Sequence, residues 1–333
     1  MASPVLIEPK STDAAFHFSA EEYLARRLTE NSKVFMIWQA ENCAMLGRNQ
    51  IAHREIDVAE AERLGIRIVR RSSGGGTIFT DMGTLLISVI TAFKNGDDAK
   101  QMLGMLADPL VSAINKFGVE AYIHGRNDIF VNEKKVSGMA QYIKDGVLVS
   151  HCSLLFDTNL DRLTTVLRTD VGKIVSKALA SMRSHVTNLS EYMPVSRTTG
   201  EFRDMLTASF VEDLNLDEYE LTEEDIQKIH EIRLQKYANN TWNIESEPRF
   251  SYRNARRFPG GKVEVHLNTE HGIIKSCVLN GDFLALLPVR RLEERIEGLP
   301  YRINTVKEAL SSFDLVPYLG TITLDELLSC VFE

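Results

Sequence analysis

Residues 70–81 read Arg-Arg-Ser-Ser-Gly-Gly-Gly-Thr-Ile-Phe-Thr-Asp and form the most distinctive run of the chain. Three consecutive glycines remove every Cβ from a turn, so backbone N–H groups can point at a ligand, and the arginines supply charge for a phosphate or carboxylate. No GxxxxGK follows, and β-forming residues follow instead of a helix, so this is neither a Walker loop nor a dinucleotide fingerprint. We predict an anion-binding loop; a flexible hairpin loop with solvated arginines is the alternative.

Hydrophobic periodicity on both sides of this run predicts helices and strands in an irregular order. Upstream, the capping-box spacing from Ser19 to Glu22 predicts a helix through Glu30, followed by a strand at 34–38 and a helix at 57–64. The further predictions are strands at 66–70, 77–79, 85–90, 129–131, 136–143 and 147–156, and helices at 99–117 (kinked or split at Pro109), 161–167, 200–214 and 222–238. Regular βαβ units are missing from this order, which predicts an α+β fold with a mixed or antiparallel sheet.

The length of the chain, 333 residues, favours two compact units. A composition shift at 239–241 and a loop-like stretch at 245–248 predict a division into residues 1–244 and 245–333. The second unit is expected to be a small α+β domain, with strands at 262–267 and 272–279 and helices at 289–296, 306–313 and 324–331.

Composition narrows the class of function. There are 38 basic and 46 acidic residues, which give a net charge of −8 and argue against a nucleic-acid partner. The four cysteines lie far apart without a CxxC pair, which indicates a reducing compartment rather than disulfides or a zinc site. Neither a signal peptide nor a membrane span is evident in the sequence. We therefore expect a cytoplasmic protein without a membrane partner.

A second polar cluster lies at residues 125–128 (Gly-Arg-Asn-Asp) and in the strand that follows it from Lys134. Asp128 is a candidate magnesium ligand, because Mg²⁺ on phosphates takes one or two carboxylates, and turn formation is its alternative role. By the period of two, one face of the following strand should carry Lys135, Ser137, Met139 and Gln141. Lys135 would then meet a ligand, whereas Lys134 at the hairpin tip would be solvated.

Four motifs, at residues 70–83, 125–129, 134–140 and 183–189, resemble the lipoate-protein ligase family in content, order and spacing. The resemblance covers nearly the whole chain, because the long form of the family carries a small C-terminal accessory domain. It implies the fold of the biotin and lipoate protein ligases and a two-step reaction. ATP and lipoate give lipoyl-AMP and pyrophosphate, and the lipoyl group then passes to a lysine of a lipoyl carrier domain, such as an E2 subunit of a 2-oxoacid dehydrogenase or the glycine cleavage H protein.

The resemblance also implies roles for individual residues, with Mg²⁺ as activator and no bound prosthetic group. Lys135 would be the catalytic residue that binds the lipoyl carboxyl and the α-phosphate, and Asp128 would support magnesium or order the adenylate loop. The residues expected to contact ATP or lipoyl-AMP are Arg71, Gly74, Gly75, Gly76, Thr77, Ile78, Phe79, Asp128 and Lys135. Those expected at lipoate are Arg71, Gly76, Lys135, Ser137 and Gly138. These roles suit adenylation, which spreads negative charge over the α-phosphate and requires no protein nucleophile.

Two other functions remain open at this stage. An ATP-independent octanoyl or lipoyl transferase would use Cys152 as its nucleophile, but neighbouring His151 should point to the opposite face of the strand and leave Cys152 as a buried structural thiol. A non-catalytic lipoate- or carrier-binding relative is the other alternative. Thr80 and Thr84 replace a histidine and an asparagine that many family members have, whereas Lys135 and the complete glycine run argue for an enzyme.

Three further expectations concern residues outside these motifs. Trp38 and Trp242 are expected in the core, and the basic run at 249–257 on a solvated face. The loop at 168–177 and the accessory domain are expected to rearrange after adenylation.

Overall fold

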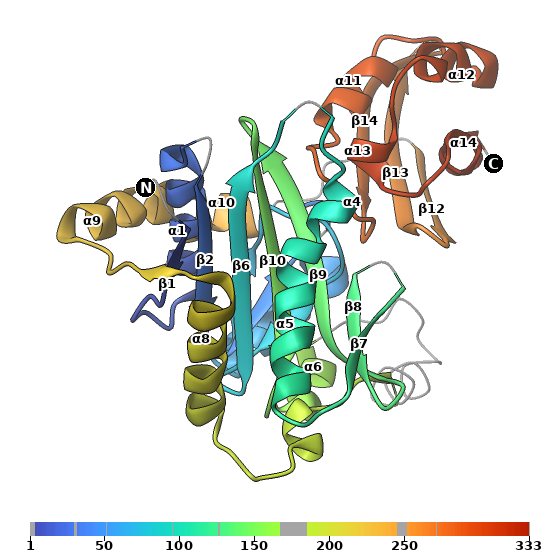
Figure 1. Cartoon of the computed structure of the whole chain (residues 1–333). Helices are drawn as coiled ribbons and strands as arrows, with labels where there is room; N and C mark the ends of the chain where they lie inside the picture. The colour runs from blue at the N-terminus through green and yellow to red at the C-terminus, as the bar shows by residue number, and fades with distance from the viewer. Residues whose placement is uncertain are drawn as a thin grey trace.

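An eight-stranded mixed sheet is the frame of the first three quarters of the chain (Figure 1). The computed structural model describes residues 4–29, 32–50, 52–94, 96–125, 127–166, 185–244, 252–270 and 272–332. The sheet has the order β11-β1-β2-β6-β10-β9-β8-β7, in which β1 is parallel to β2 and β11 and the other neighbours are antiparallel. Its strands are β1 (Val5–Ile7), β2 (Lys33–Trp38), β6 (Thr84–Ala92), β7 (Ala121–His124), β8 (Asp128–Val131), β9 (Lys134–Lys144), β10 (Val147–Leu155) and β11 (Asp217–Glu218).

Helices cover both faces of this sheet because its strands alternate apolar residues between the two sides. On one side, α5 (Gly104–Lys116) and α8 (Thr199–Leu214) pack on residues such as Ile87 of β6. On the other side, α1 (Ala14–Arg27), α9 (Glu223–Ile232) and the π-helical turn η2 (Arg233–Tyr237) pack on residues such as Ile90 of the same strand. The short helices are α2 (Ala52–Glu55), α3 (Val58–Arg63), α4 (Ala99–Met102), α6 (Leu160–Val166), η1 (Leu189–Tyr192) and α10 (Asn240–Asn243).

A small three-stranded sheet lies on the α1 side and carries the glycine run. Its order is β4-β3-β5, with β3 (Cys43–Leu46) between β4 (Arg67–Arg70) and β5 (Ile78–Thr80). Residues 71–77, which connect β4 to β5, are called the glycine loop below. Met45 and Val69 of this sheet share a core with α1 and with Trp38 of the large sheet. The glycine loop is therefore held between the two sheets.

The C-terminal part has its own sheet and core (Figure 1). Its antiparallel strands are β12 (Tyr252–Phe258), β13 (Gly261–Glu270) and β14 (Ile273–Gly281), and its helices are α11 (Arg290–Ile296), α12 (Ile303–Ser311), α13 (Val316–Leu319) and α14 (Leu324–Phe332). The segment that follows β14 touches the rest of the chain through backbone hydrogen bonds. Gly75 N–H donates to Phe283 O at 3.2 Å, and Ile143 N–H donates to Leu286 O at 2.8 Å.

The predicted α+β class with a mixed sheet and a small C-terminal domain is confirmed. The predicted boundary at 244/245 adjoins residues 245–251, and the loop predicted to move at 168–177 falls within 167–184; both stretches lie outside the described residues. Among the residues that are described, no helix is long and apolar enough to cross a membrane.

Two local predictions were wrong. Helix α1 begins at Ala14 rather than after Ser19, because the Asp13 carboxylate caps it by accepting from Ala15 N–H. The long helix at 99–117 is interrupted at Leu103, between α4 and α5, and Pro109 lies inside α5. Strands β3, β7 and β12 were not predicted; their short or arginine-rich sequences give little alternation to detect.

Candidate active site

A cavity of about 400 Å³ opens beside the glycine loop. Every predicted site residue except Gly74 lines it. Part of its wall is apolar and part is polar. The apolar side chains are Phe18, Trp38, Met45, Ile78, Phe79, Leu86, Met139, Ala140, Leu155, Val186 and Leu284, together with the Cys152 thiol; the polar ones are Arg71, Thr77, Asn127, Asp128, Lys135, Ser137, His151, Ser153 and Asp282. The cavity thus offers a surface for an acyl chain together with cationic and hydrogen-bonding groups for an anion.

The three glycines of the loop have different surroundings. A Cβ on Gly74 would lie 2.7 Å from Phe283 O and 2.8 Å from Ala285 N, so the C-terminal part approaches too closely for any side chain at this position. Gly75 has a φ of +87°, which L-residues rarely adopt. Gly74 therefore serves the contact with the C-terminal part, while Gly75 and Gly76 line the cavity.

Arg71 supports the glycine loop from within the protein. Its Nε donates to Ser73 Oγ, its Nη1 to Met45 O, and its Nη2 to the carbonyls of Gly74 and Gly76, at 2.7–3.0 Å. These bonds use four of the five N–H donors of the guanidinium. Burial lowers the pKa of Arg71 to about 10, so the side chain stays protonated at neutral pH. In this structure Arg71 shapes the loop that would hold an anion.

A second loop, Gly47–Gln50, braces the glycine loop and was missed by the sequence reasoning. The Gln50 side-chain oxygen accepts from Thr77 Oγ1 at 2.9 Å, and the Arg70 guanidinium donates to the carbonyls of Gly47, Arg48 and Gln50. A Cβ on Gly47 would lie 1.9 Å from Gly75 O, so only glycine fits there. The sequence offered no clear signal for this loop, because the strand β3 that precedes Gly47 was not predicted either.

Lys135 lies at the cavity beside Asp128, with 2.8 Å between Nζ and Oδ1. The prediction that Lys135 shares a strand face with Ser137 and Met139 is wrong. The register between β8 and β9 shifts, pairing Ile129 with Ser137 but Phe130 with Lys135, so Val136 is an extra residue in a β-bulge. Lys135 is turned onto the face of Gly138, where an added Cβ would lie 2.9 Å from Nζ. Gly138 therefore leaves room for the lysine.

A buried chain of hydrogen bonds runs from the apolar wall to the glycine loop. Trp38 Nε1 donates to Ser88 Oγ (3.1 Å), which donates to Glu21 Oε1 (2.6 Å). Glu21 Oε1 lies 3.0 Å from His151 Nδ1, and His151 Nε2 lies 2.7 Å from Ser73 Oγ. Trp38 is buried as predicted, yet it also lines the cavity.

Ser73, His151 and Glu21 follow the order of a hydrolase triad, but Ser73 is fully buried and does not line the cavity. Its hydroxyl also accepts from Arg71 Nε. The three residues therefore fix the shape of the loop and cavity rather than attack a substrate.

Cys152 lies in the core on the α5 side of the sheet, whereas His151 reaches Glu21 of α1 on the other side. The prediction of opposite faces is confirmed. Burial raises the pKa of the Cys152 thiol to about 12, so it is not a thiolate at neutral pH.

Solved lipoate protein ligases share this fold. The structure superimposes on LipL1 of P. falciparum in complex with lipoate with a TM-score of 0.79, covering 98% of both chains at 19% identity. It also superimposes on the bi-partite lipoate protein ligase of Thermoplasma acidophilum with a TM-score of 0.66 at 25% identity, covering 76% of this chain and all of the other. The fold is therefore that of the lipoate protein ligases.

Family models and sequence relatives agree with the fold. Residues 13–211 match the lipoyl protein ligase A/B catalytic domain, and residues 247–331 match the bacterial lipoate protein ligase C-terminus. The chain is 34% identical to lipoate-protein ligase LplJ of Bacillus subtilis (96% of this chain, 97% of the relative) and 30% identical to lipoate–protein ligase 1 of Staphylococcus aureus (95% and 96%). The chain belongs to the lipoate-protein ligase family and is an enzyme of the ligase class.

Proposed function

We propose that the chain is an ATP-dependent lipoate-protein ligase that forms lipoyl-AMP and transfers the lipoyl group to a lysine of lipoyl carrier domains, such as E2 subunits and the glycine cleavage H protein. The observation that carries this proposal is a single cavity with an apolar wall and, beside it, Lys135 and the glycine loop. An apolar surface suits the acyl tail of lipoate, and the cationic and N–H groups suit its carboxylate and the phosphates of ATP. The crystal structure of a lipoate-protein ligase A with this fold is bound with ATP.

In the first step, a carboxylate oxygen of lipoate attacks the α-phosphorus of ATP, and pyrophosphate leaves. Negative charge increases on the α-phosphate, and we assign its stabilisation to the Lys135 ammonium and the N–H group of Gly76, both of which line the cavity. In the second step, the carrier lysine amine attacks the acyl carbon and AMP leaves. Both steps need position and charge from the protein, and neither needs a protein nucleophile.

Asp128 is the candidate magnesium ligand. Among the residues that the structure describes, no cluster of three or more His, Cys, Asp or Glu side chains could hold a metal ion alone. One carboxylate at the cavity nevertheless fits Mg²⁺, which takes one or two carboxylates and completes its coordination with phosphates and water. When bound, Mg²⁺ would neutralise phosphate charge next to Lys135.

We assign the adenylation and transfer sites to residues 1–244 and an accessory role to residues 245–333. Asp282 and Leu284 of the C-terminal part line the cavity, which supports a role for that part in closing the site over lipoate and ATP. We also propose a cytoplasmic location, supported by four buried cysteines that are all free thiols.

The acyl transferase alternative is less well supported, because Cys152 is buried and its thiol is protonated at neutral pH. The non-catalytic alternative would leave unexplained why Lys135, Asp128 and the glycine loop converge on one cavity.

The test is an intact-mass assay of a purified lipoyl domain with lipoate and Mg²⁺, with and without ATP. We expect a lipoyl mass gain that requires ATP and is lost in Lys135→Ala. Lys134→Ala, at the neighbouring position in the hairpin, is the matched control and should retain the gain. ATP-independent transfer from an acylated carrier that is abolished by Cys152→Ala would refute the proposal.

A further inference from the structure

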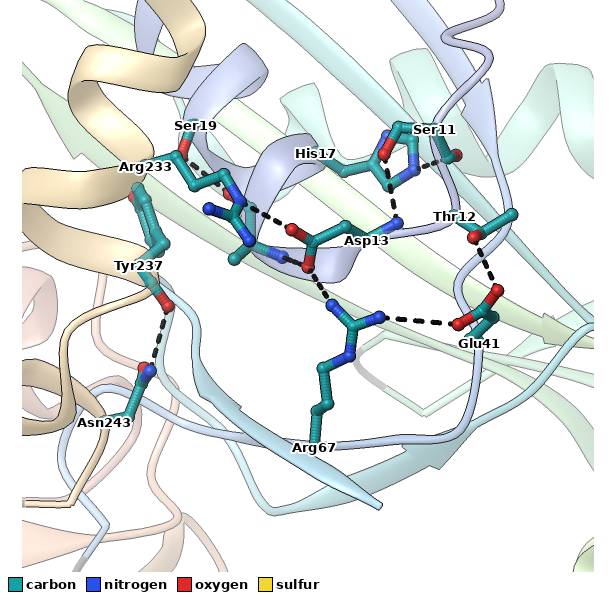
Figure 2. A network of polar contacts seen from close by, with 11 residues as sticks. Ser11, Thr12, Asp13, His17, Ser19, Glu41, Arg67, Arg233, Tyr237 and Asn243 are labelled. Carbon is teal, nitrogen blue, oxygen red and sulfur yellow. Dashed lines mark hydrogen bonds and ion pairs between the residues drawn. The ribbon is translucent and has the colours of Figure 1, made fainter. Parts of the chain in front are cut away.

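The segment Arg233–Asn243 lies between the two family matches, after residue 211 and before residue 247. We call it the strut. It comprises the π-helical turn η2 and the short helix α10. Figure 2 shows Arg233 and Tyr237 coming from one helix and Asn243 from the chain that follows. None of the predictions from sequence assigned the strut a role.

The strut holds the residue that leads into the glycine loop. Trp242 Nε1 donates to Arg70 O at 2.8 Å, and Arg70 Nε donates back to Trp242 O at 2.8 Å. The Asn243 side-chain oxygen accepts from Arg70 N–H at 2.9 Å. Arg70 Nη2 also donates to Asn243 O at 3.2 Å, so four hydrogen bonds join two short segments that lie more than 170 residues apart in the chain.

Lys236 connects the strut to the glycine loop itself. Its ammonium donates to Glu22 Oε2 (2.8 Å), Ser72 Oγ (2.9 Å) and Tyr237 Oη (3.1 Å), which accounts for all three of its N–H donors. The ammonium also lies over the rings of Tyr237 and Trp242, at 4.5 and 4.4 Å from their centroids. Burial lowers the pKa of Lys236, while the Glu22 carboxylate opposes this and favours the charged form.

The other end of the strut is anchored at the start of α1. Arg233 Nε donates to Asp13 Oδ2 at 2.6 Å, and Asp13 also pairs with Arg67 of β4 (Figure 2). Within the strut, Asn243 Nδ2 donates to Tyr237 O at 2.9 Å. Both ends of the strut are held by hydrogen bonds, at Arg233 and at Asn243. The strut can therefore hold Lys236, and through it Ser72, in a fixed position.

The neighbouring Ser73 is held from the cavity side by His151. Ser72 and Ser73, immediately before the three glycines, are therefore held by two different side chains, Lys236 and His151. Glycines have no side chain to restrain their own backbone, so the shape of the loop depends on hydrogen bonds from other residues, including those that hold Ser72 and Ser73.

We infer that Lys236 is a positioning residue, which acts through Ser72 to aim the N–H groups of the glycine loop at the phosphates of the nucleotide. The inference rests on the proposed function for the identity of the nucleotide. The coupling between Lys236 and the glycine loop is independent of the proposed function, because it follows from the hydrogen bonds alone. A segment that only filled space would not direct the three N–H donors of one partly buried ammonium at three separate acceptors.

The experiment compares Lys236→Met with wild type and with Lys228→Met, a matched change at an exposed lysine of α9. In Lys236→Met we expect the KM for ATP to rise about tenfold, the loss typical of one charge-assisted hydrogen bond, while the KM for lipoate stays within about twofold. Amide hydrogen exchange of a peptide covering residues 70–79 should become faster. Lys228→Met should change neither the KM for ATP nor the amide hydrogen exchange at residues 70–79.

A double mutant separates the proposed route from general destabilisation. If Lys236 acts through Ser72, the double variant that carries Lys236→Met and Ser72→Ala should not have a higher KM for ATP than the single variant with the higher KM. Additive effects, or a lower melting temperature with unchanged exchange at 70–79, would overturn the inference. If Lys236→Met does not fold, Trp242→Phe removes the indole donor to Arg70 and reduces the ring surface under the Lys236 ammonium, and it should give a smaller change of the same kind.

Hydrogen exchange needs no catalytic activity. Suppose that the wild type has no ligase activity but that Lys236→Met still changes the exchange at 70–79. This result would refute the proposed function and would support the coupling between Lys236 and the glycine loop. The opposite result, an active ligase whose loop exchange does not respond, would refute the coupling alone.

Discussion

Replacing Gly47 by alanine should damage the glycine loop directly. The new Cβ would lie 1.9 Å from Gly75 O, whereas real Cβ contacts are essentially never shorter than 3.0 Å, so one of the two loops must move by about 1 Å. A displacement of that size in a group that positions substrate costs about 100-fold in rate, equivalent to about 3 kcal/mol in the activation free energy. We therefore expect kcat/KM for ATP to fall about 100-fold in Gly47→Ala.

The assay is ATP-dependent lipoylation of a lipoyl domain at varied ATP, with the melting temperature measured in parallel. Gly83→Ala is the matched control, because its Cβ would meet a different backbone carbonyl, Asp157 O, at 2.0 Å. It should lower stability by a similar amount but reduce kcat/KM much less, since it does not touch the glycine loop. A folded Gly47→Ala variant with kcat/KM within about threefold of wild type would refute the reasoning.

Three further predictions follow from the cavity and the core. Lys135→Met should lower the rate of lipoate-dependent pyrophosphate exchange by about 10²- to 10³-fold, as for removal of one charge-stabilising donor, and a loss of less than about fivefold would contradict its assigned role. Cys152→Ala should retain at least about half of the ligase activity, measured by intact mass, because the proposed reaction needs no protein nucleophile and the buried thiol is protonated at neutral pH. Burial lowers the pKa of His17 from 6.5 to about 4, so between these values the unfolded chain binds more protons and stability falls as the pH falls. Denaturant unfolding should show that the free energy of unfolding falls by about 2 kcal/mol from pH 7 to pH 5 because of His17. An equal fall in the variant His17→Phe would contradict this prediction.

The residues that line the cavity beside the glycine loop were largely predictable from local sequence. The glycine run, Asp128 and Lys135 are recognisable because anion binding needs glycines, a carboxylate and a cation in short, ordered motifs. The cavity brings these motifs together, as expected for residues that act on one substrate. What the motifs did not reveal is how Lys135 reaches the cavity, because the bulge at Val136 depends on the register between β8 and β9.

The supporting residues were not predictable in the same way. Gly47 is one glycine among 20, and its requirement becomes visible only when Gly75 O is placed beside it. Tryptophan is common in cores and lysine is common on surfaces, so the residue types of Trp38 and Lys236 reveal nothing special. Only their hydrogen bonds, to Ser88 and Ser72, distinguish these two residues.

The sequence by itself determined the class of fold, the family and most of the predicted residues that line the cavity, because each of these follows from periodicity or from a short motif. The tertiary structure alone decided which groups hold the glycine loop in shape, because those contacts join segments far apart in the chain. Arg70 and Trp242 are separated by 172 positions, and Ser73 and His151 by 78. Such hydrogen bonds depend on the packing of whole strands and helices, which a local pattern does not encode.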